Sequence, residues 1–200
     1  VPYIKVDDTS EYQRNILVKD YGDQLSKLHI IGVTGTNGKT TSCFLIYQML
    51  LSLGIDAAYI GTIGYYCKDD YIELNNTTPD IVVVYQLLTR AQESGCKVVV
   101  MEVSSQALSY NRLFGINYST IGFTNFTEDH LDYHKTMENY LEAKKLILDH
   151  LTENAIISSK EKAEFSRKKE EIKQVTPQNR DDFIPKHADN PVYQKTVKTQ

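Results

Sequence analysis

The sequence predicts an α/β fold of three layers, in which a mainly parallel sheet is flanked by helices. Apolar runs typical of strands alternate along the chain with segments whose apolar residues have helical spacing. The first of these runs leads into a glycine-containing loop, and a helical segment follows that loop directly. Gly35, Glu102 and Asn125 fall at or just past the ends of three strands, where such sheets bind their ligands.

Strands and helices follow one another regularly after residue 28. The expected strands cover residues 29–34, 57–60, 62–67, 71–74, 97–103, 119–125 and 155–158. The expected helices cover residues 39–53, 79–94 and 136–151. Gly54 and Gly95 end the first two helices, and Pro79 is placed to open the second. The first helix is apolar enough to be mostly buried, and the turn at residues 68–70 predicts a hairpin between the strands around it.

The two ends of the chain differ in composition from the middle. Residues 1–28 are polar and mixed, with a helix capped at residues 8–11 and broken at residues 21–23. We expect them to form a linker segment rather than a core element. Residues 29–160 form the predicted domain. Residues 161–200 are polar, and their lysine- and glutamate-rich start predicts a solvated helix followed by a weakly ordered tail.

The composition limits the class of protein. With 200 residues, 41% of them hydrophobic, the chain can form one domain with a sizeable core. The net charge of -4 argues against a nucleic-acid-binding protein, which needs a basic face. No apolar run approaches the roughly 20 residues that cross a bilayer, and residues 1–8 lack the features of a signal peptide. We therefore expect a cytoplasmic protein without membrane insertion. Cys43, Cys67 and Cys96 are scattered, which favours reduced thiols over a zinc site or a disulfide framework.

Residues 30–41 have the sequence of a strand, a phosphate-binding loop (P-loop) and the start of a helix. Gly35 and Gly38 lack a Cβ, so backbone N–H groups can curl around an anion at the positive end of the helix. Lys39 can reach the β- and γ-phosphates of a nucleotide, and Thr40 can ligate magnesium. The loop is shorter than the common P-loop. The strand before it and the helix after it nevertheless favour a nucleotide site over a structural turn.

Two later segments could add metal-binding groups. Glu102 closes an apolar strand, where a buried carboxylate is unfavourable unless it meets a cation such as magnesium beside Thr40. The alternative is an acid that simply reaches solvent. The polar cluster at residues 129–134 contains His130, which can bind a metal, and its spacing from His134 can also suggest zinc, although no third ligand is evident. From the residues alone, surface histidines are an equal alternative.

The remaining polar groups have structural as well as functional interpretations. Lys144 and Lys145 lie on a predicted helix, where paired lysines usually face solvent, and the residues alone do not single out Lys144. Hydroxyl, amide and guanidinium groups from two further segments could recognise a phosphate or carboxylate. Taken separately they could be loop caps, but together at one sheet edge they suggest a second anionic ligand beside the nucleotide. These groups belong to Asn76, Thr77, Thr78, Ser104, Ser105 and Arg112.

Four of these segments, in this order, resemble the motifs of the Mur ligase family. They are residues 34–41, 76–79, 101–105 and 129–134, and residues 137–144 extend the likeness. Over residues 29–158 the chain most resembles the UDP-N-acetylmuramoyl-tripeptide synthetases, the MurE type. The resemblance implies an enzyme, an ATP-dependent ligase that adds an amino acid to a UDP-N-acetylmuramoyl peptide in peptidoglycan synthesis. In such ligases ATP phosphorylates the peptide carboxylate, and the incoming amine attacks the acyl phosphate.

The resemblance also implies roles for individual residues. Nucleotide binding would fall to Gly35, Thr36, Asn37, Gly38, Lys39, Thr40, Thr41 and Asn125. The magnesium ligands would be Thr40, Glu102, His130 and Lys144. The UDP-muramoyl peptide would contact Asn76, Thr77, Thr78, Ser104 and Arg112. Catalysis would depend on Lys39, Glu102, His130 and Lys144. Lys144 resembles the family's carbamylated lysine, whose CO₂ adduct turns a cation into a carboxylate that faces the metal, so the resemblance reverses the solvated-face interpretation.

Mur ligases have three domains, and the motifs present here belong to the central one. In the family an N-terminal domain binds the UDP part, and a C-terminal domain recognises the amino acid. We therefore expect this chain to be a central ATP-binding domain that is incomplete as a ligase. A non-catalytic nucleotide-binding module and a folylpolyglutamate synthetase-like amide ligase are the alternatives. The sequence does not predict the incoming amino acid or the oligomeric state.

Overall fold

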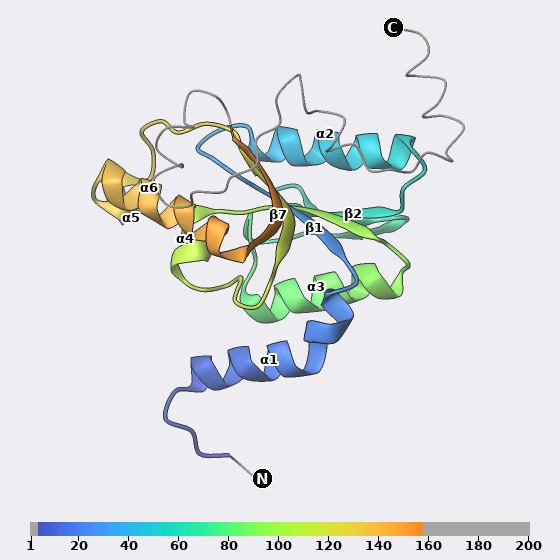
Figure 1. The fold of residues 1–200 in the computed structure, drawn as a ribbon, viewed down its shortest axis with the longest axis horizontal. Coiled ribbons are helices and arrows are strands. Elements are labelled where there is room, and N and C mark those ends of the chain that lie inside the picture. Colours follow the sequence, from blue (N-terminus) through green and yellow to red (C-terminus); the bar gives the residue numbers. More distant parts are fainter. Residues whose placement is uncertain (1–3, 158–200) are drawn as a thin grey trace, which may run out of the picture.

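The computed structural model describes residues 4–157, and this part of the chain has the three predicted layers (Figure 1). Within the described residues a seven-stranded sheet forms the middle layer, with α2 (Lys39–Ser52) on one face and α3 (Ile81–Glu93) and α1 (Thr9–Leu25) on the other. The strands are β1 (His29–Thr34), β2 (Ala57–Gly61), β3 (Gly64–Cys67), β4 (Asp70–Ile72), β5 (Val98–Glu102), β6 (Tyr118–Phe123) and β7 (Leu151–Ile157). The other helices are α4 (Ser105–Ser109), α5 (Leu131–His134), α6 (Met137–Lys145) and the 3₁₀ helix η1 (Leu146–His150).

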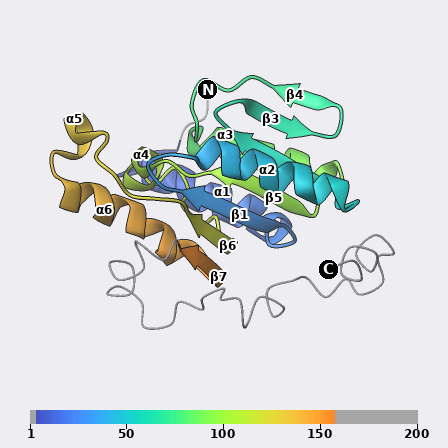
Figure 2. The ribbon, with the colours of Figure 1, turned by 90° about the horizontal axis from the view of Figure 1, so that it is seen from above.

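The strands lie in the order β4-β3-β2-β5-β1-β6-β7 across the sheet (Figure 2). β1 pairs in parallel with β5 and β6, which in turn pair in parallel with β2 and β7. β3 and β4 add an antiparallel hairpin at one edge, as predicted. The mainly parallel α/β fold is therefore confirmed. Because parallel strands end at the same edge, the ends of β1 and β5 meet there, with Val33 paired to Glu102.

The sheet separates two apolar cores. Successive residues of its central strands face opposite sides, so Tyr59 and Val100 belong to one core while Ile60 and Met101 belong to the other. The smaller core lies under α2, and the larger one lies under α1 and α3. Burial on both faces explains why the parallel strands are continuous apolar runs rather than alternating ones. Among the described helices, none combines the length and the apolar character that a membrane span requires.

Helix α1 is longer and more tightly packed than the sequence predicts. Asp8 caps it as expected, accepting two backbone N–H hydrogen bonds of 2.7 and 3.0 Å. The predicted break at residues 21–23 is wrong, because the helix continues to Leu25. Leu17 and Leu25 are buried in the larger core, and the helix packs against α3, which offsets the unfavourable glycine in its last turns. Residues of α1 thus contribute to the core, so the expectation that this segment holds no core element is wrong.

The structure also differs from the sequence-based predictions in elements after α1. The prediction that α2 is mostly buried is wrong: Leu45 is 57% and Met49 is 62% exposed, because only one face of the helix meets the sheet. The helix predicted over residues 136–151 ends early and continues as η1, so the last strand begins at Leu151, before its predicted start. The short helices α4 and α5 are not predicted by the sequence pattern. The polar helix and tail predicted beyond residue 160 lie outside the described residues, and the division into domains stays a prediction.

We expect Gly32→Ala to destabilise the central strand β1, while Gly122→Ala on β6 is tolerated. A Cβ at residue 32 would lie 2.7 Å from the ring of Tyr118, which is completely buried. A Cβ at residue 122 would lie 3.4 Å from its nearest neighbour, Val33, which is an ordinary contact. Overpacking a core costs about 1–3 kcal/mol. Urea unfolding should show a loss of this size for Gly32→Ala alone, and equal losses for the two variants would contradict the prediction.

Candidate functional site

The loop between β1 and α2 has the backbone shape that its glycines predict. Gly35 has a φ of 141° and Gly38 a φ of 81°, both in the left-handed region that favours glycine. A Cβ on Gly35 would lie 2.0 Å from the Thr124 hydroxyl, so this residue has no room for a side chain. A Cβ on Gly38, by contrast, would meet nothing within 4 Å. Gly38 precedes the first turn of α2 and supplies no side-chain cap, and the first N–H groups of a helix have no partner within it.

The segment after β6 holds this loop in place. The backbone N–H of Asn37 donates to the Asn125 side chain at 2.9 Å, and the Asn125 amide donates back to the Asn37 carbonyl at 3.1 Å. The Thr36 backbone N–H donates to the Asn125 carbonyl at 2.9 Å, and the Thr124 hydroxyl donates to the Asn37 carbonyl at 2.7 Å. Asn125, which the sequence analysis assigned to nucleotide binding, therefore supports the loop directly. Thr127 completes this support through its contacts with Thr36, and the sequence analysis missed it.

Lys39 folds back over the loop. Its ammonium donates hydrogen bonds of 2.9 Å to the carbonyls of Gly35 and Thr36. Burial lowers the pKa of Lys39, while the negative charges of Glu102 and Asp129 act in the opposite direction. The ammonium is thus held at the mouth of the glycine loop, where its charge can meet that of a phosphate. Thr41, another predicted residue of the site, is exposed in the first turn of α2.

Glu102 is completely buried at the end of β5, so the alternative in which its carboxylate reaches solvent is wrong. The Thr40 hydroxyl donates to Oε2 at 2.8 Å, which brings together two of the four residues predicted to bind magnesium. Thr62 contacts both oxygens, through its N–H to Oε1 at 2.9 Å and its hydroxyl to Oε2 at 3.2 Å. The Tyr59 hydroxyl also donates to Oε1. Sequence analysis missed Thr62, although it follows a parallel strand and meets the criterion that selected Glu102; no pattern marks Tyr59.

A cavity of about 260 Å³ opens beside the loop at the carboxyl edge of the sheet. It brings together Lys39, His130 and Lys144 with all six residues predicted to contact a second anionic ligand. The complete lining comprises Lys39, Asn75, Asn76, Thr77, Thr78, Ser104, Ser105, Gln106, Arg112, His130 and Lys144. The Thr77 hydroxyl lies 3.0 Å from the Thr62 hydroxyl, which in turn contacts Glu102. The cavity and the carboxylate are therefore joined by one chain of hydroxyl groups.

Thr78 and Arg112 organise the wall of this cavity. The buried Thr78 hydroxyl donates to the Glu102 carbonyl at 2.9 Å and accepts from the Ser104 N–H at 3.0 Å. Arg112 donates to the Thr78 carbonyl at 3.2 Å and forms an ion pair with Asp80 at 3.0 Å. Thr78 therefore has a structural role in addition to lining the cavity. The Arg112 guanidinium adds a positive charge to the lining of the cavity.

Lys144 is buried, with 1% of its surface exposed, so the solvated-face interpretation is wrong. Its ammonium donates to the Gly35 carbonyl at 2.8 Å and lies 4.3 Å from the centre of the Tyr140 ring. Burial, with the positive charge of Lys39 adding to it, lowers the pKa of Lys144 to about 7, against the attraction of Asp129. Lys145 pairs instead with Glu142 at 2.8 Å. Adjacent lysines of one helix thus have different environments.

The two histidines after β6 do not form a zinc site. The His134 ring is buried and its Nε2 lies 2.9 Å from the Ser105 hydroxyl, while burial lowers the pKa of this histidine. His130 has a left-handed backbone and lies beside Asp129, 3.5 Å from its carboxylate, with its side chain turned to the cavity. Within residues 4–157, no group of three or more His, Cys, Asp or Glu side chains could hold a metal. The HxxxH spacing therefore reflects one structural histidine and one histidine at the cavity.

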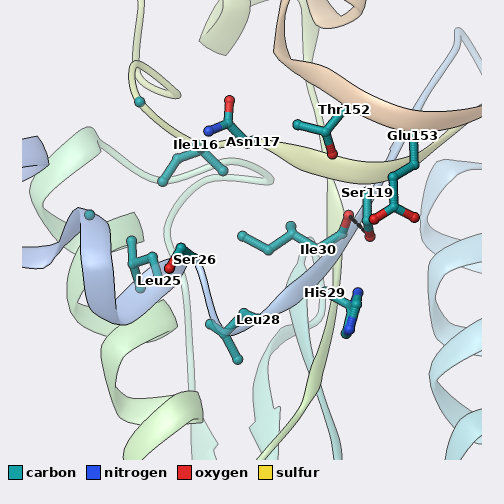
Figure 3. A pocket seen from close by; sticks show the side chains of 12 residues that line it. Leu25, Ser26, Leu28, His29, Ile30, Ile116, Asn117, Ser119, Thr152 and Glu153 are labelled. Carbon is teal, nitrogen blue, oxygen red and sulfur yellow. Dashed lines mark hydrogen bonds between the residues drawn. The ribbon is translucent and has the colours of Figure 1, made fainter.

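A second cavity, of about 250 Å³, lies at the opposite edge of the sheet, where β1, β6 and β7 begin (Figure 3). Apolar side chains such as Leu28 and Ile116 share its lining with polar ones such as His29 and Glu153. None of the residues predicted to bind nucleotide, metal or substrate lines it. The candidate site is therefore the cavity at the carboxyl edge.

The glycine loop lies at the carboxyl edge of a parallel sheet and is followed by a lysine. A buried acid faces it from the strand adjacent in the sheet, and this arrangement defines a P-loop α/β domain. The sequence and the structure agree on this class. The chain belongs to the Mur ligase family, since the model of the Mur ligase middle domain matches residues 33–192. The family resemblance seen in the sequence is thereby confirmed.

Individual relatives carry the comparison further. The chain is 45% identical over 155 residues to the UDP-N-acetylmuramoyl-L-alanyl-D-glutamate–2,6-diaminopimelate ligase of Phocaeicola vulgatus, covering 78% of this chain and 32% of that protein. It is 40% identical over 182 residues to the ligase of the same name from Chlorobium phaeobacteroides, and this match covers 90% of this chain and 35% of that protein. The chain therefore spans about a third of the length of the curated relatives it matches.

Solved structures also match the fold of this chain over part of their own length. A structure of a UDP-N-acetylmuramoyl-L-alanyl-D-glutamate–2,6-diaminopimelate ligase superposes with a TM-score of 0.69 at 30% identity, covering 83% of this chain and 34% of that one. E. coli FolC in complex with DHPP and ADP superposes with a TM-score of 0.54 at 17% identity, and the match covers 80% of this chain and 45% of that one. The second likeness concerns the fold alone.

Proposed function

We propose that this chain is the ATP-binding part of a longer ligase that joins an amino acid to a UDP-N-acetylmuramoyl peptide in peptidoglycan synthesis. The observation that carries the proposal is the contact between Thr40 and the buried Glu102 beside the glycine loop. A buried carboxylate surrounded by hydroxyl groups at a phosphate loop suits a nucleotide-bound metal. The likeness to diaminopimelate ligases supports the substrate class. An ATP-dependent reaction on a nucleotide-linked substrate also accords with the expected cytoplasmic location.

The residues present fit Mg-ATP. Oxygen donors are the ligands that Mg²⁺ prefers, and Thr40 and Glu102 offer a hydroxyl and a carboxylate 2.8 Å apart. The N-terminus of α2 directly follows the glycine loop, and helix N-termini bind phosphate through their N–H groups. When bound, Mg²⁺ would neutralise charge on the phosphates. Lys39 would add positive charge at the same place, and His130, at the cavity wall, is the proposed further metal ligand.

The cavity residues would bind and orient the peptide substrate. Asn76, Thr77 and Ser104 would offer neutral hydrogen-bonding groups, and Arg112 would offer charge to a phosphate or carboxylate. Transfer of the ATP γ-phosphate to the peptide carboxylate would give an acyl phosphate and ADP. Attack by the amine of the amino acid would then give the amide and release phosphate. Since two anions must approach each other in the first step, the positive charges around the cavity would lower its barrier.

The proposal is tested by calorimetric titration of the 200-residue chain with ATP, with and without Mg²⁺. We expect Mg²⁺-dependent binding and little or no ligase activity, because the chain spans about a third of its relatives. Absence of any nucleotide binding would reject the proposal. A non-catalytic module is the alternative, and amide formation from UDP-muramoyl dipeptide, ATP and an amino acid would exclude it. Tighter binding of a folate than of the UDP-muramoyl peptide would favour a folylpolyglutamate synthetase-like ligase.

We further propose that Lys144 becomes carbamylated. Only a neutral amine attacks CO₂, and a pKa of about 7 leaves a large fraction of Lys144 neutral at physiological pH. In ¹³C-bicarbonate buffer, we expect the chain to give a carbamate ¹³C signal that disappears in Lys144→Arg and persists in Lys145→Arg. Lys145 is a fair control because it is the adjacent residue and is also largely buried. An identical signal in the Lys144→Arg variant would contradict the assignment.

A further inference from the structure

The two oxygens of the Glu102 carboxylate have different partners. Oε1 accepts hydrogen bonds from the Tyr59 hydroxyl and the Thr62 N–H, whereas Oε2 accepts from the hydroxyls of Thr40 and Thr62. We propose that Tyr59 is a positioning residue that occupies Oε1, so that Glu102 presents only Oε2 to a metal. This inference rests on the proposed function, because it assumes that Glu102 faces a nucleotide-bound metal.

The position of the Tyr59 hydroxyl is set by the packing of its ring. Tyr59 is completely buried in the core under α2. Phe44 meets the ring edge-on at a centroid distance of 5.6 Å, and Tyr47 and Tyr66 lie at 6.2 and 6.0 Å. This aromatic cluster restricts the side chain to one orientation, which points the hydroxyl toward the end of β5. Packing alone would be served by a phenylalanine, so the buried hydroxyl requires another explanation.

Space for this contact depends on Gly61. A Cβ at residue 61 would lie 2.3 Å from both the Tyr59 hydroxyl and Oε1 of Glu102. Tyr59 in β2 and Thr62 just after it therefore both donate to Oε1 of Glu102. The missing side chain at Gly61, between them, leaves room for this carboxylate oxygen. A carboxylate oxygen can only accept, so the Tyr59 hydroxyl acts as the donor in this contact.

The consequence is a carboxylate prepared for a single bond to a metal. Mg²⁺ requires nearly octahedral geometry, whereas the larger Ca²⁺ also accepts a carboxylate through both oxygens. Oε1 is held by the hydroxyl of the packed Tyr59 ring and by a backbone N–H, whereas both donors to Oε2 are threonine hydroxyls, which can rotate. One of these hydroxyls belongs to Thr40, itself a proposed metal ligand, so Oε2 is the oxygen that can turn to a metal. Groups that orient a ligand in this way typically account for about 10–100-fold in metal affinity. Loss of the Tyr59 hydroxyl should therefore weaken Mg²⁺ more than Ca²⁺.

The test compares Tyr59→Phe with Tyr47→Phe in the full chain. Tyr47 belongs to the same aromatic cluster, so its variant also loses a hydroxyl from that cluster but keeps the hydrogen bonds described for Glu102. The measurement is the concentration of Mg²⁺ or Ca²⁺ that gives half-maximal ATP binding in calorimetric titrations. For Tyr59→Phe we expect the Mg²⁺ midpoint to rise about tenfold, the Ca²⁺ midpoint to rise less, and metal-free ATP binding to remain unchanged. Tyr47→Phe should keep the parent midpoints.

The outcomes separate this inference from the proposed function. If Glu102→Gln loses the metal dependence while Tyr59→Phe keeps the parent midpoints, the positioning role is rejected and the proposed function stands. If the parent chain shows no metal dependence at all, the proposed function and this inference both fail. A lower melting temperature with unchanged midpoints would mean that Tyr59 only packs, and would also reject the role. Should Tyr59→Phe not fold, Tyr59→Met provides a second hydroxyl-free variant for the same measurement.

Discussion

Lys39→Ala is expected to weaken Mg-ATP binding by at least about 100-fold. Charge-assisted hydrogen bonds contribute about 1.5–3 kcal/mol each, and a lysine at the end of a P-loop contacts phosphate oxygens with its full charge. In the structure the ammonium is already held at the loop by the carbonyls of Gly35 and Thr36, within 2.9 Å of each. Little ordering of the side chain would therefore be needed on binding. Isothermal titration calorimetry of the variant and the parent measures the effect.

Two further variants make the Lys39 experiment specific. Lys97→Ala removes an exposed lysine that precedes β5, at the opposite edge of the sheet, and should bind Mg-ATP like the parent. Lys39→Arg keeps the charge and should lose less affinity than Lys39→Ala. Because Lys39 also bonds two loop carbonyls, thermal unfolding of each variant is needed to show that the loop remains folded. Equal affinities for Lys39→Ala and the parent would overturn the assignment of the phosphate site.

Lys144 is expected to contribute a component to the stability of the parent chain that increases with pH, and this component should be absent in Lys144→Met. The pKa of Lys144 falls from 10.5 to about 7 in the folded protein, because the ammonium is buried. Between these values the unfolded chain binds more protons than the folded chain, so the free energy of unfolding increases as the pH rises. For one group with such a shift, the gain is about 2 kcal/mol between pH 7 and pH 9.

The measurement is urea unfolding at a series of pH values in CO₂-free buffer, since a carbamate would change the charge of the side chain. Tyrosines and cysteines also titrate in this range, but they are common to all the variants and cancel in the difference. Lys145→Met is the matched control, because Lys145 is the next residue and is also largely buried, but its ammonium pairs with the carboxylate of Glu142. Its pH dependence should follow that of the parent. A Lys144→Met variant with the parent's pH dependence would show that the buried amine does not carry this effect.

Much of the fold follows from local patterns in the sequence. Buried parallel strands need apolar side chains on both faces, and this explains why β1 and β5 are continuous apolar runs whose positions the sequence predicts well. Gly35 and Gly38 adopt backbone angles that other residues rarely adopt, so the position of the loop can also be predicted from the sequence. Helix α1 was predicted too short, because its continuation through Gly22 depends on packing against α3, which no local pattern records.

The candidate site divides in the same way. By itself the sequence determined that a P-loop follows β1, that Glu102 ends the neighbouring apolar strand, and, through its resemblance to a family, that Lys144 is of interest. Only the tertiary structure decided that Lys144 bonds the Gly35 carbonyl while Lys145, also buried, pairs with a carboxylate, and that Tyr59 reaches Glu102. The physical reason is that strand and loop signals are local, whereas burial and hydrogen bonding depend on contacts between residues far apart in the chain.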